Sequence, residues 1–149
     1  MNEASQWIAV WAAGLFSGAA LYVSLVEHPA RMQCGNVLAV TEFGPSYKRA
    51  ALMQSILALL GSMGALVAWL AGDGPIWAVG GLLLLFSVPF TLIVIFPTNK
   101  QLLAPSLDST SEAAAKLLAR WNRLHAVRSI LSGIAFALLL YRLASGGAV

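Results

Sequence analysis

The sequence has few charges, one cysteine and two histidines. Only 10% of its 149 residues are charged and 59% are hydrophobic, which lies outside the range of ordinary soluble domains. The lone Cys34 excludes an intramolecular disulfide, and no Cys/His spacing typical of a zinc site occurs. The composition therefore predicts a membrane protein. The net charge of the chain is +3, and in a membrane protein an excess of basic residues indicates how the helices are oriented in the membrane rather than that the protein binds nucleic acid.

Four hydrophobic runs predict four membrane helices in a single transmembrane domain, residues 1–149, with spans near residues 5–27, 50–71, 76–97 and 122–144. The dense turn signal from Gly72 to Pro75 predicts that the second and third spans form an antiparallel hairpin. The predicted fold class is all-α, an integral membrane four-helix bundle with up-down-up-down topology.

Prolines and polar residues predict where the spans end. Pro29 and Pro97 are predicted to close the first and third spans, and Pro89 is predicted to kink the third. Residues 30–49 are predicted to form a polar connection. Residues 100–123 form a second connection, in which Asp108 to Glu112 resembles a helix start.

The basic residues predict the orientation of the bundle. Four spans place both termini on one side and both long connections on the other, which carries eight of the nine basic residues: Arg31, Lys48, Arg49, Lys100, Lys116, Arg120, Arg123 and Arg128. The positive-inside rule then predicts cytoplasmic connections and outward-facing termini, in a plasma or inner membrane.

The two halves of the chain share a weak repeat. The segment from Tyr47 to Leu57 matches the segment from Trp121 to Leu131 at an Arg, a Ser, an Ile and a Leu. Each segment begins the second span of a helix hairpin that consists of a span, a proline, a polar connection and a second span. Duplication of a helix hairpin explains the match, and chance in an apolar background is the alternative. Under duplication, His125 and Arg128 stand where the first copy has Ala51 and Gln54.

The last span carries ionisable residues into the bilayer. Only thirteen uncharged residues separate Arg128 from Arg142, whereas about 20 are needed to cross the hydrocarbon. The span therefore begins earlier and includes Trp121, His125 and Arg128, which share one helical face. The topology brings six polar residues from four spans into one layer: Glu27, His28, Tyr47, Asn99, His125 and Arg128.

Each of these residues also has a purely structural interpretation. Arg128 can snorkel to lipid headgroups, and His125 can bond a carbonyl group. Trp121 and Tyr47 can anchor the helices at the membrane interface. His28 can be an exposed residue at the helix boundary, and Glu27 can be an ion-pair partner of Arg128 or Arg31. Asn99 can bond the carbonyls at a helix end.

The motif Pro97-x-Asn99-x-x-Leu102, followed by Trp121-x-x-x-His125-x-x-Arg128, resembles the paired signature of small four-helix membrane proteins related to fungal anthrone oxygenases. The resemblance implies insertion of oxygen from O2 into an enolisable phenolic or polycyclic aromatic substrate, without metal or flavin. In that chemistry His125 is the base, while Arg128 and Asn99 stabilise the enolate oxygen.

The same resemblance gives roles to the surrounding residues. Trp121 and Tyr47 would bound an aromatic slot, and Glu27 or His28 would orient His125 or relay its proton. The expected partners are a small aromatic or anionic molecule and membrane lipids, and a homo-oligomer is an alternative to a monomer.

Two other classes of function compete with an oxygenase. His28 and His125 could ligate a haem iron, or could join Glu27 around a copper or iron ion. A non-enzymatic protein, either a transport subunit or a lipid-binding or assembly module, is the second alternative.

Overall fold

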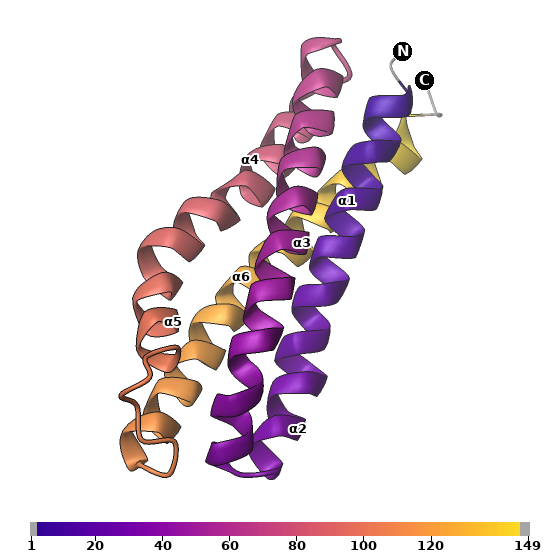
Figure 1. The fold of residues 1–149 in the computed structure, drawn as a ribbon. Coiled ribbons are helices and arrows are strands. Elements are labelled where there is room, and N and C mark those ends of the chain that lie inside the picture. Colours follow the sequence, from indigo (N-terminus) through magenta and orange to yellow (C-terminus); the bar gives the residue numbers. More distant parts are fainter. Residues whose placement is uncertain (1–2, 147–149) are drawn as a thin grey trace.

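The computed structural model describes residues 3–146, and all regular structure in this part of the chain is helical. The elements are α1 (Glu3–Tyr22), the π-helical turn η1 (Val23–Glu27), α2 (His28–Gln33), α3 (Asn36–Leu70), α4 (Pro75–Phe90), the π-helical turn η2 (Thr91–Ile95), α5 (Phe96–Leu102) and α6 (Glu112–Ser145). Because α1, η1 and α2 follow one path, as do α4, η2 and α5, the chain forms four antiparallel rods (Figure 1). Each is long and apolar enough to cross a membrane. The predicted all-α four-helix fold is confirmed.

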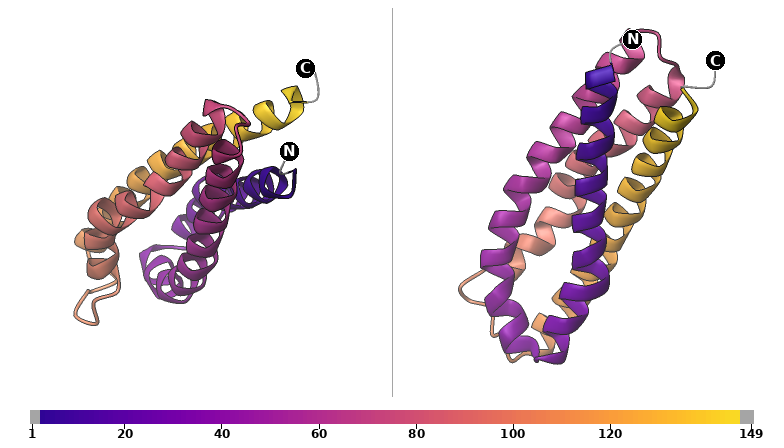
Figure 2. Two further views of the ribbon diagram at one scale, coloured as in Figure 1. Left: turned by 90° about the horizontal axis from the view of Figure 1, so that it is seen from above. Right: turned by 90° about the vertical axis from the view of Figure 1, so that its right-hand side faces the viewer.

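The four rods pack in a ring. Helix α1 packs against α3 and α6, and α4 packs against the same two helices from the opposite side. Views from above and from the side show the rods running alongside one another, with both described ends of the chain close together (Figure 2). The resulting up-down-up-down arrangement places α2, α5 and the start of α6 at the other end of the bundle.

The end that holds the termini is packed through small residues. A Cβ on Gly64 of α3 would lie 2.7 Å from the carbonyl oxygen of Ser5 and 2.9 Å from the amide nitrogen of Ala9, both in α1. A Cβ on Gly81 of α4 would meet Ala65 at 2.9 Å. Small residues permit such close approach of backbones in membrane helices, so they fix the spacing of three helices here.

The prediction of a long polar connection at residues 30–49 is wrong. Helix α2 continues to Gln33, and α3 begins at Asn36, so the connection is a tight turn at Cys34 and Gly35. Gly35 adopts a φ of +92°, which glycine reaches without strain. The segment is helical because Ala39 and Phe43, one turn apart, are both buried against the other helices.

Pro29 and Pro97 do not end helices, contrary to the prediction. The residue before each proline donates its N–H five residues back, from His28 to the Val23 carbonyl and from Phe96 to the Thr91 carbonyl. These π-helical turns shift the backbone hydrogen-bond pattern by one residue just before the proline, which has no N–H to donate. The path of α4, η2 and α5 also bends between the labels of α4 and α5 (Figure 1), and Pro89 lies near the end of α4.

The remaining turns agree with the sequence predictions. Helices α3 and α4 meet in a short turn, where the Gln6 amide donates to the Asp73 carboxylate (2.6 Å) and Arg142 Nε donates to the Asp73 carbonyl (2.9 Å). Helix α6 begins at Glu112, and the Ser111 hydroxyl accepts a hydrogen bond from the Ala114 amide. Both features match the turn and cap chemistry read from the sequence.

Candidate functional site

The wider end of the bundle contains a cavity of about 140 Å³ between all four rods. Five predicted site residues line it: Tyr47, Asn99, Trp121, His125 and Arg128. Its volume is close to the ~150 Å³ of an engineered protein cavity that accepts benzene. The predicted convergence of these residues on one layer is therefore seen in the structure, and the cavity has room for about one aromatic ring.

His125 lies in a hydrogen-bond chain whose direction is fixed by Arg128. Arg128 Nη2 lies 2.5 Å from His125 Nε2, and a guanidinium group only donates. Nε2 must therefore accept, which makes Nδ1 the protonated nitrogen of a neutral imidazole. Nδ1–H donates to Ser24 Oγ, 2.8 Å away, and Ser24 contacts Ser129 Oγ at 2.9 Å. Ser129 Oγ in turn lies within hydrogen-bond distance of the backbone carbonyls of His125 (3.0 Å) and Ala20 (3.1 Å), and its single hydroxyl proton can be donated to either one.

Aromatic rings hold this chain in place. The Trp121 ring stacks on His125 with centroids 4.6 Å apart, and Phe43 meets Trp121 edge-on at 5.4 Å. Phe43 also stacks on Tyr47 at 5.8 Å, and the Arg128 guanidinium lies over the Phe16 ring. Rings in these arrangements attract one another, so Trp121 and Tyr47 belong to a packed aromatic part of the cavity wall.

Polar atoms without protein partners face the same space. Within residues 3–146, the Asn99 Oδ1, both amide atoms of Gln54 and Arg128 Nε make no hydrogen bond, and all three residues line the cavity. Asn99 is 1% exposed and Gln54 is 3% exposed. Because buried polar groups are normally paired, these atoms are suited to a polar ligand.

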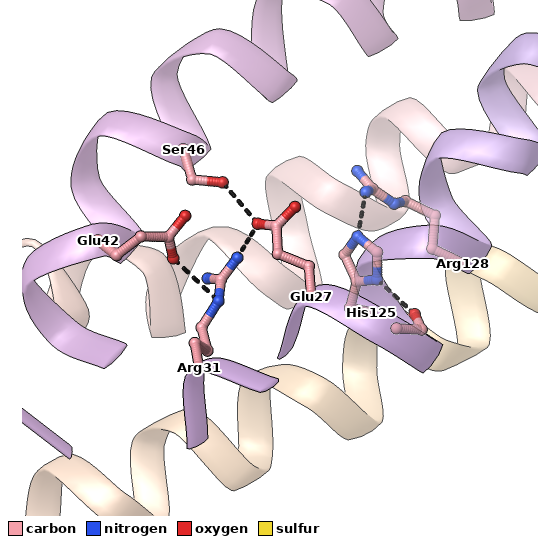
Figure 3. A network of polar contacts seen from close by, with 7 residues as sticks. Glu27, Arg31, Glu42, Ser46, His125 and Arg128 are labelled. Carbon is pink, nitrogen blue, oxygen red and sulfur yellow. Dashed lines mark hydrogen bonds and ion pairs between the residues drawn. The ribbon is translucent and has the colours of Figure 1, made fainter. Parts of the chain in front are cut away.

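Glu27 and His28 lie beside the cavity and do not contact His125 through hydrogen bonds. Glu27 accepts from Arg31 and from Ser46, and Arg31 also pairs with Glu42 at 2.9 Å (Figure 3). Of the two partners predicted for Glu27, the structure therefore selects Arg31. The partner that orients His125 is Ser24, a residue that the sequence analysis did not identify.

The arrangement of the two histidines differs from a metal site. Both nitrogens of His125 are engaged by Ser24 and Arg128, and the imidazoles of His28 and His125 both contact the ring of Trp121. Among residues 3–146, no group of three His, Cys, Asp or Glu side chains is placed to hold an ion. In this geometry, the alternative ligand set of His28, His125 and Glu27 does not converge.

Equivalent positions of the two hairpins line the cavity together. In the register of the sequence repeat, Tyr47 corresponds to Trp121, Ala51 to His125 and Gln54 to Arg128, and all six line the cavity. This pairing is the arrangement that duplication of a helix hairpin would give. It also shows the signal by which Gln54 could have been found, because Gln54 occupies the position of Arg128 in the other copy.

The fold and site define an all-helical membrane protein with a partly open, mainly apolar cavity at one end of the bundle, into which a few polar side chains project. The family model described as anthrone oxygenase matches residues 43–138, more than half of the chain. The chain therefore belongs to the anthrone oxygenase family, which confirms the resemblance and supports a related, oxygenase-like function. Searches against curated proteins and solved structures returned no match.

Proposed function

We propose that this protein is a membrane-embedded, cofactor-free oxygenase that oxidises an activated methylene of a phenolic aromatic substrate with O2. The observation that carries the proposal is the neutral His125, with Nε2 as its acceptor nitrogen, in a cavity that Arg128 and Asn99 also line. A base beside anion-stabilising donors in a water-poor space is what such chemistry requires.

The reaction balances without an external reductant. His125 removes a C–H proton, and the electron pair spreads onto the phenolic or enolate oxygen. The resulting carbanion reduces O2 and forms a C–O bond to it, which gives a peroxide that takes the proton back from His125. Loss of the second C–H proton with cleavage of the O–O bond gives a ketone and water. The substrate supplies all the electrons, so each methylene group and molecule of O2 give a carbonyl group and a molecule of water.

Arg128 couples substrate binding to exposure of the base. In the structure its Nη2 donates a hydrogen bond to His125 Nε2, which prevents Nε2 from accepting a proton from the substrate. A substrate oxygen that draws the guanidinium away would free Nε2, and the planar group would then bind the developing anion. Asn99 can donate through its side-chain amide to the same oxygen, while the rings of Trp121 and Tyr47 hold the aromatic body.

The test uses 1,8-dihydroxyanthrone with protein purified in lipid nanodiscs, following O2 consumption above the spontaneous rate and ¹⁸O incorporation from ¹⁸O2. We expect His125→Ala to reduce turnover by about 10²- to 10⁴-fold, the range of general-base catalysis. Arg128→Lys keeps the charge, loses the planar fork and should reduce turnover while the bundle stays folded. Wild-type protein that fails to exceed the spontaneous rate with several anthrones would contradict the proposal.

The cofactor-free character needs its own measurement. Absorbance spectra and metal analysis of the active preparation should show neither a Soret band nor iron or copper in stoichiometric amount. Either finding would replace this mechanism with metal or haem chemistry.

We also propose that the end holding the cavity faces the cytoplasm and that both termini face outward, as the basic residues indicate. Cys34, exposed in the turn between α2 and α3, is a native reporter. A membrane-impermeant maleimide should label Cys34 in inverted vesicles and spare it in intact cells. A Cys34→Ser, Ala71→Cys variant should show the reverse pattern, and labelling of Cys34 in intact cells would overturn the orientation.

A further inference from the structure

A groove of about 840 Å³ runs along the outer face of α1 and α3, beside the cavity. Toward the termini the two helices are held together at Gly64, as described above. Toward the cavity, Gly18 of α1 and Met53 and Leu57 of α3 line the groove. A Cβ placed on Gly18 would find no atom within 4 Å, so the groove is open at this position.

The groove and the cavity share part of their walls. Both spaces are lined by Val23, Ser46, Ala50 and Gln54. Among them Gln54 is 3% exposed, and neither its amide nitrogen nor its amide oxygen has a partner within the described residues. No hydrogen bond has to break when this side chain turns, so Gln54 is suited to act as a movable partition between the two spaces.

We propose, building on the proposed function, that the groove is the second half of the substrate site. It takes the apolar remainder of an extended molecule whose ionisable hydroxyl is held by Arg128. The size of the two spaces carries this step, because the cavity of about 140 Å³ accepts about one ring and a polycyclic substrate must extend beyond it. The molecule reaches the groove from the lipid, and the Gln54 amide bonds a polar group at the junction.

The experiment compares a small and a large phenol, phenol itself and 1-hydroxypyrene. Binding is measured by equilibrium dialysis against empty nanodiscs of the same lipid, so that partition into lipid cancels. Gly18→Leu and Met53→Trp fill the groove from α1 and from α3. Ala137→Leu is the matched control, since Ala137 is exposed on α6 and lines neither space. Melting temperatures check that each variant is folded.

We expect both groove variants to weaken binding of 1-hydroxypyrene by about tenfold or more, equal to about 1.4 kcal/mol, and to leave phenol binding within about twofold. Ala137→Leu should leave both unchanged, and Arg128→Gln should weaken both. Wild-type binding of 1-hydroxypyrene by folded Gly18→Leu and Met53→Trp proteins would overturn the groove proposal. Phenol binding that is independent of Arg128 would instead count against the proposed function.

Discussion

The two ends of the bundle are built from different residues and have different tasks. At the end that holds the termini, the core is mainly alanine around a few larger side chains: Ala9, Ala13, Ala65, Ala68, Ala135, Trp77, Leu84 and Leu139. At the other end the core is aromatic and branched, with Phe43, Ile95, Leu118 and Trp121. The first end brings helix backbones into contact, whereas the second keeps them apart and encloses the cavity.

This difference separates stability from chemistry along one set of helices. Lipid is as apolar as a leucine side chain, so membrane helices associate mainly through close packing and not through the hydrophobic effect. The alanine- and glycine-rich end can therefore hold the bundle together while the cavity end leaves the Gln54 amide and Asn99 Oδ1 without protein partners among the described residues. Substitutions at the tight end should consequently change mainly stability, and substitutions at the cavity end should change mainly activity.

The largest expected effect on stability is at the tight end. Gly64→Ala places a Cβ against the backbone of Ser5 and Ala9, which cannot yield as a side chain would. We expect a loss of about 2–3 kcal/mol in the free energy of unfolding, measured by SDS-induced unfolding in mixed micelles. Gly18→Ala is the matched control, since its Cβ meets open space and should leave stability unchanged or slightly increased. Equal losses for the two variants would remove the distinction between the ends.

A smaller effect, on activity alone, is expected at the cavity end. Ser24→Ala removes the acceptor 2.8 Å from His125 Nδ1 and leaves Ser129 Oγ at 3.4 Å. We expect turnover to fall by about fivefold, since one hydrogen bond contributes about 1 kcal/mol, with little change in the melting temperature. Ser62→Ala is the control at the tight end, where the hydroxyl bonds only the Ala58 carbonyl of its own helix. A Ser24→Ala protein with normal turnover would show that Ser24 does not position His125.

The sequence predicted the four spans and the residues that share a face of the last span better than the path of the chain between the spans. The four spans and the shared face of Trp121, His125 and Arg128 follow from hydrophobic run lengths and helical periodicity. The π-helical turns do not follow, because their cause is a proline that breaks a helix in soluble proteins and is accommodated here by packing. Since η1 carries Ser24, the partner of His125 could not be identified without that geometry.

The smallest effect we predict lies in the connection beyond the cavity end, residues 103–111, which sets the start of α6. The Asp108 carboxylate accepts hydrogen bonds from the backbone and hydroxyl of Thr110 (2.8 and 2.7 Å), which lower the pKa of Asp108 below its ordinary value. A depressed carboxyl pKa stabilises the folded turn above the unfolded pKa of about 3.9, and the contribution is lost as the pH falls through the folded value.

Hydrogen exchange over residues 108–114 should therefore rise between about pH 4 and strongly acidic pH, while exchange in α3 and α4 stays unchanged. In Asp108→Ala the same amides should exchange faster at neutral pH. After correction for the intrinsic pH dependence of exchange, the variant should show no rise on acidification. If the rise persists in Asp108→Ala, another group such as Glu112 controls the turn. Because Asp108 is fully exposed, the effect should stay local and leave the cavity and the tight end unaltered, so that acid opens the entry to α6 before either end of the bundle.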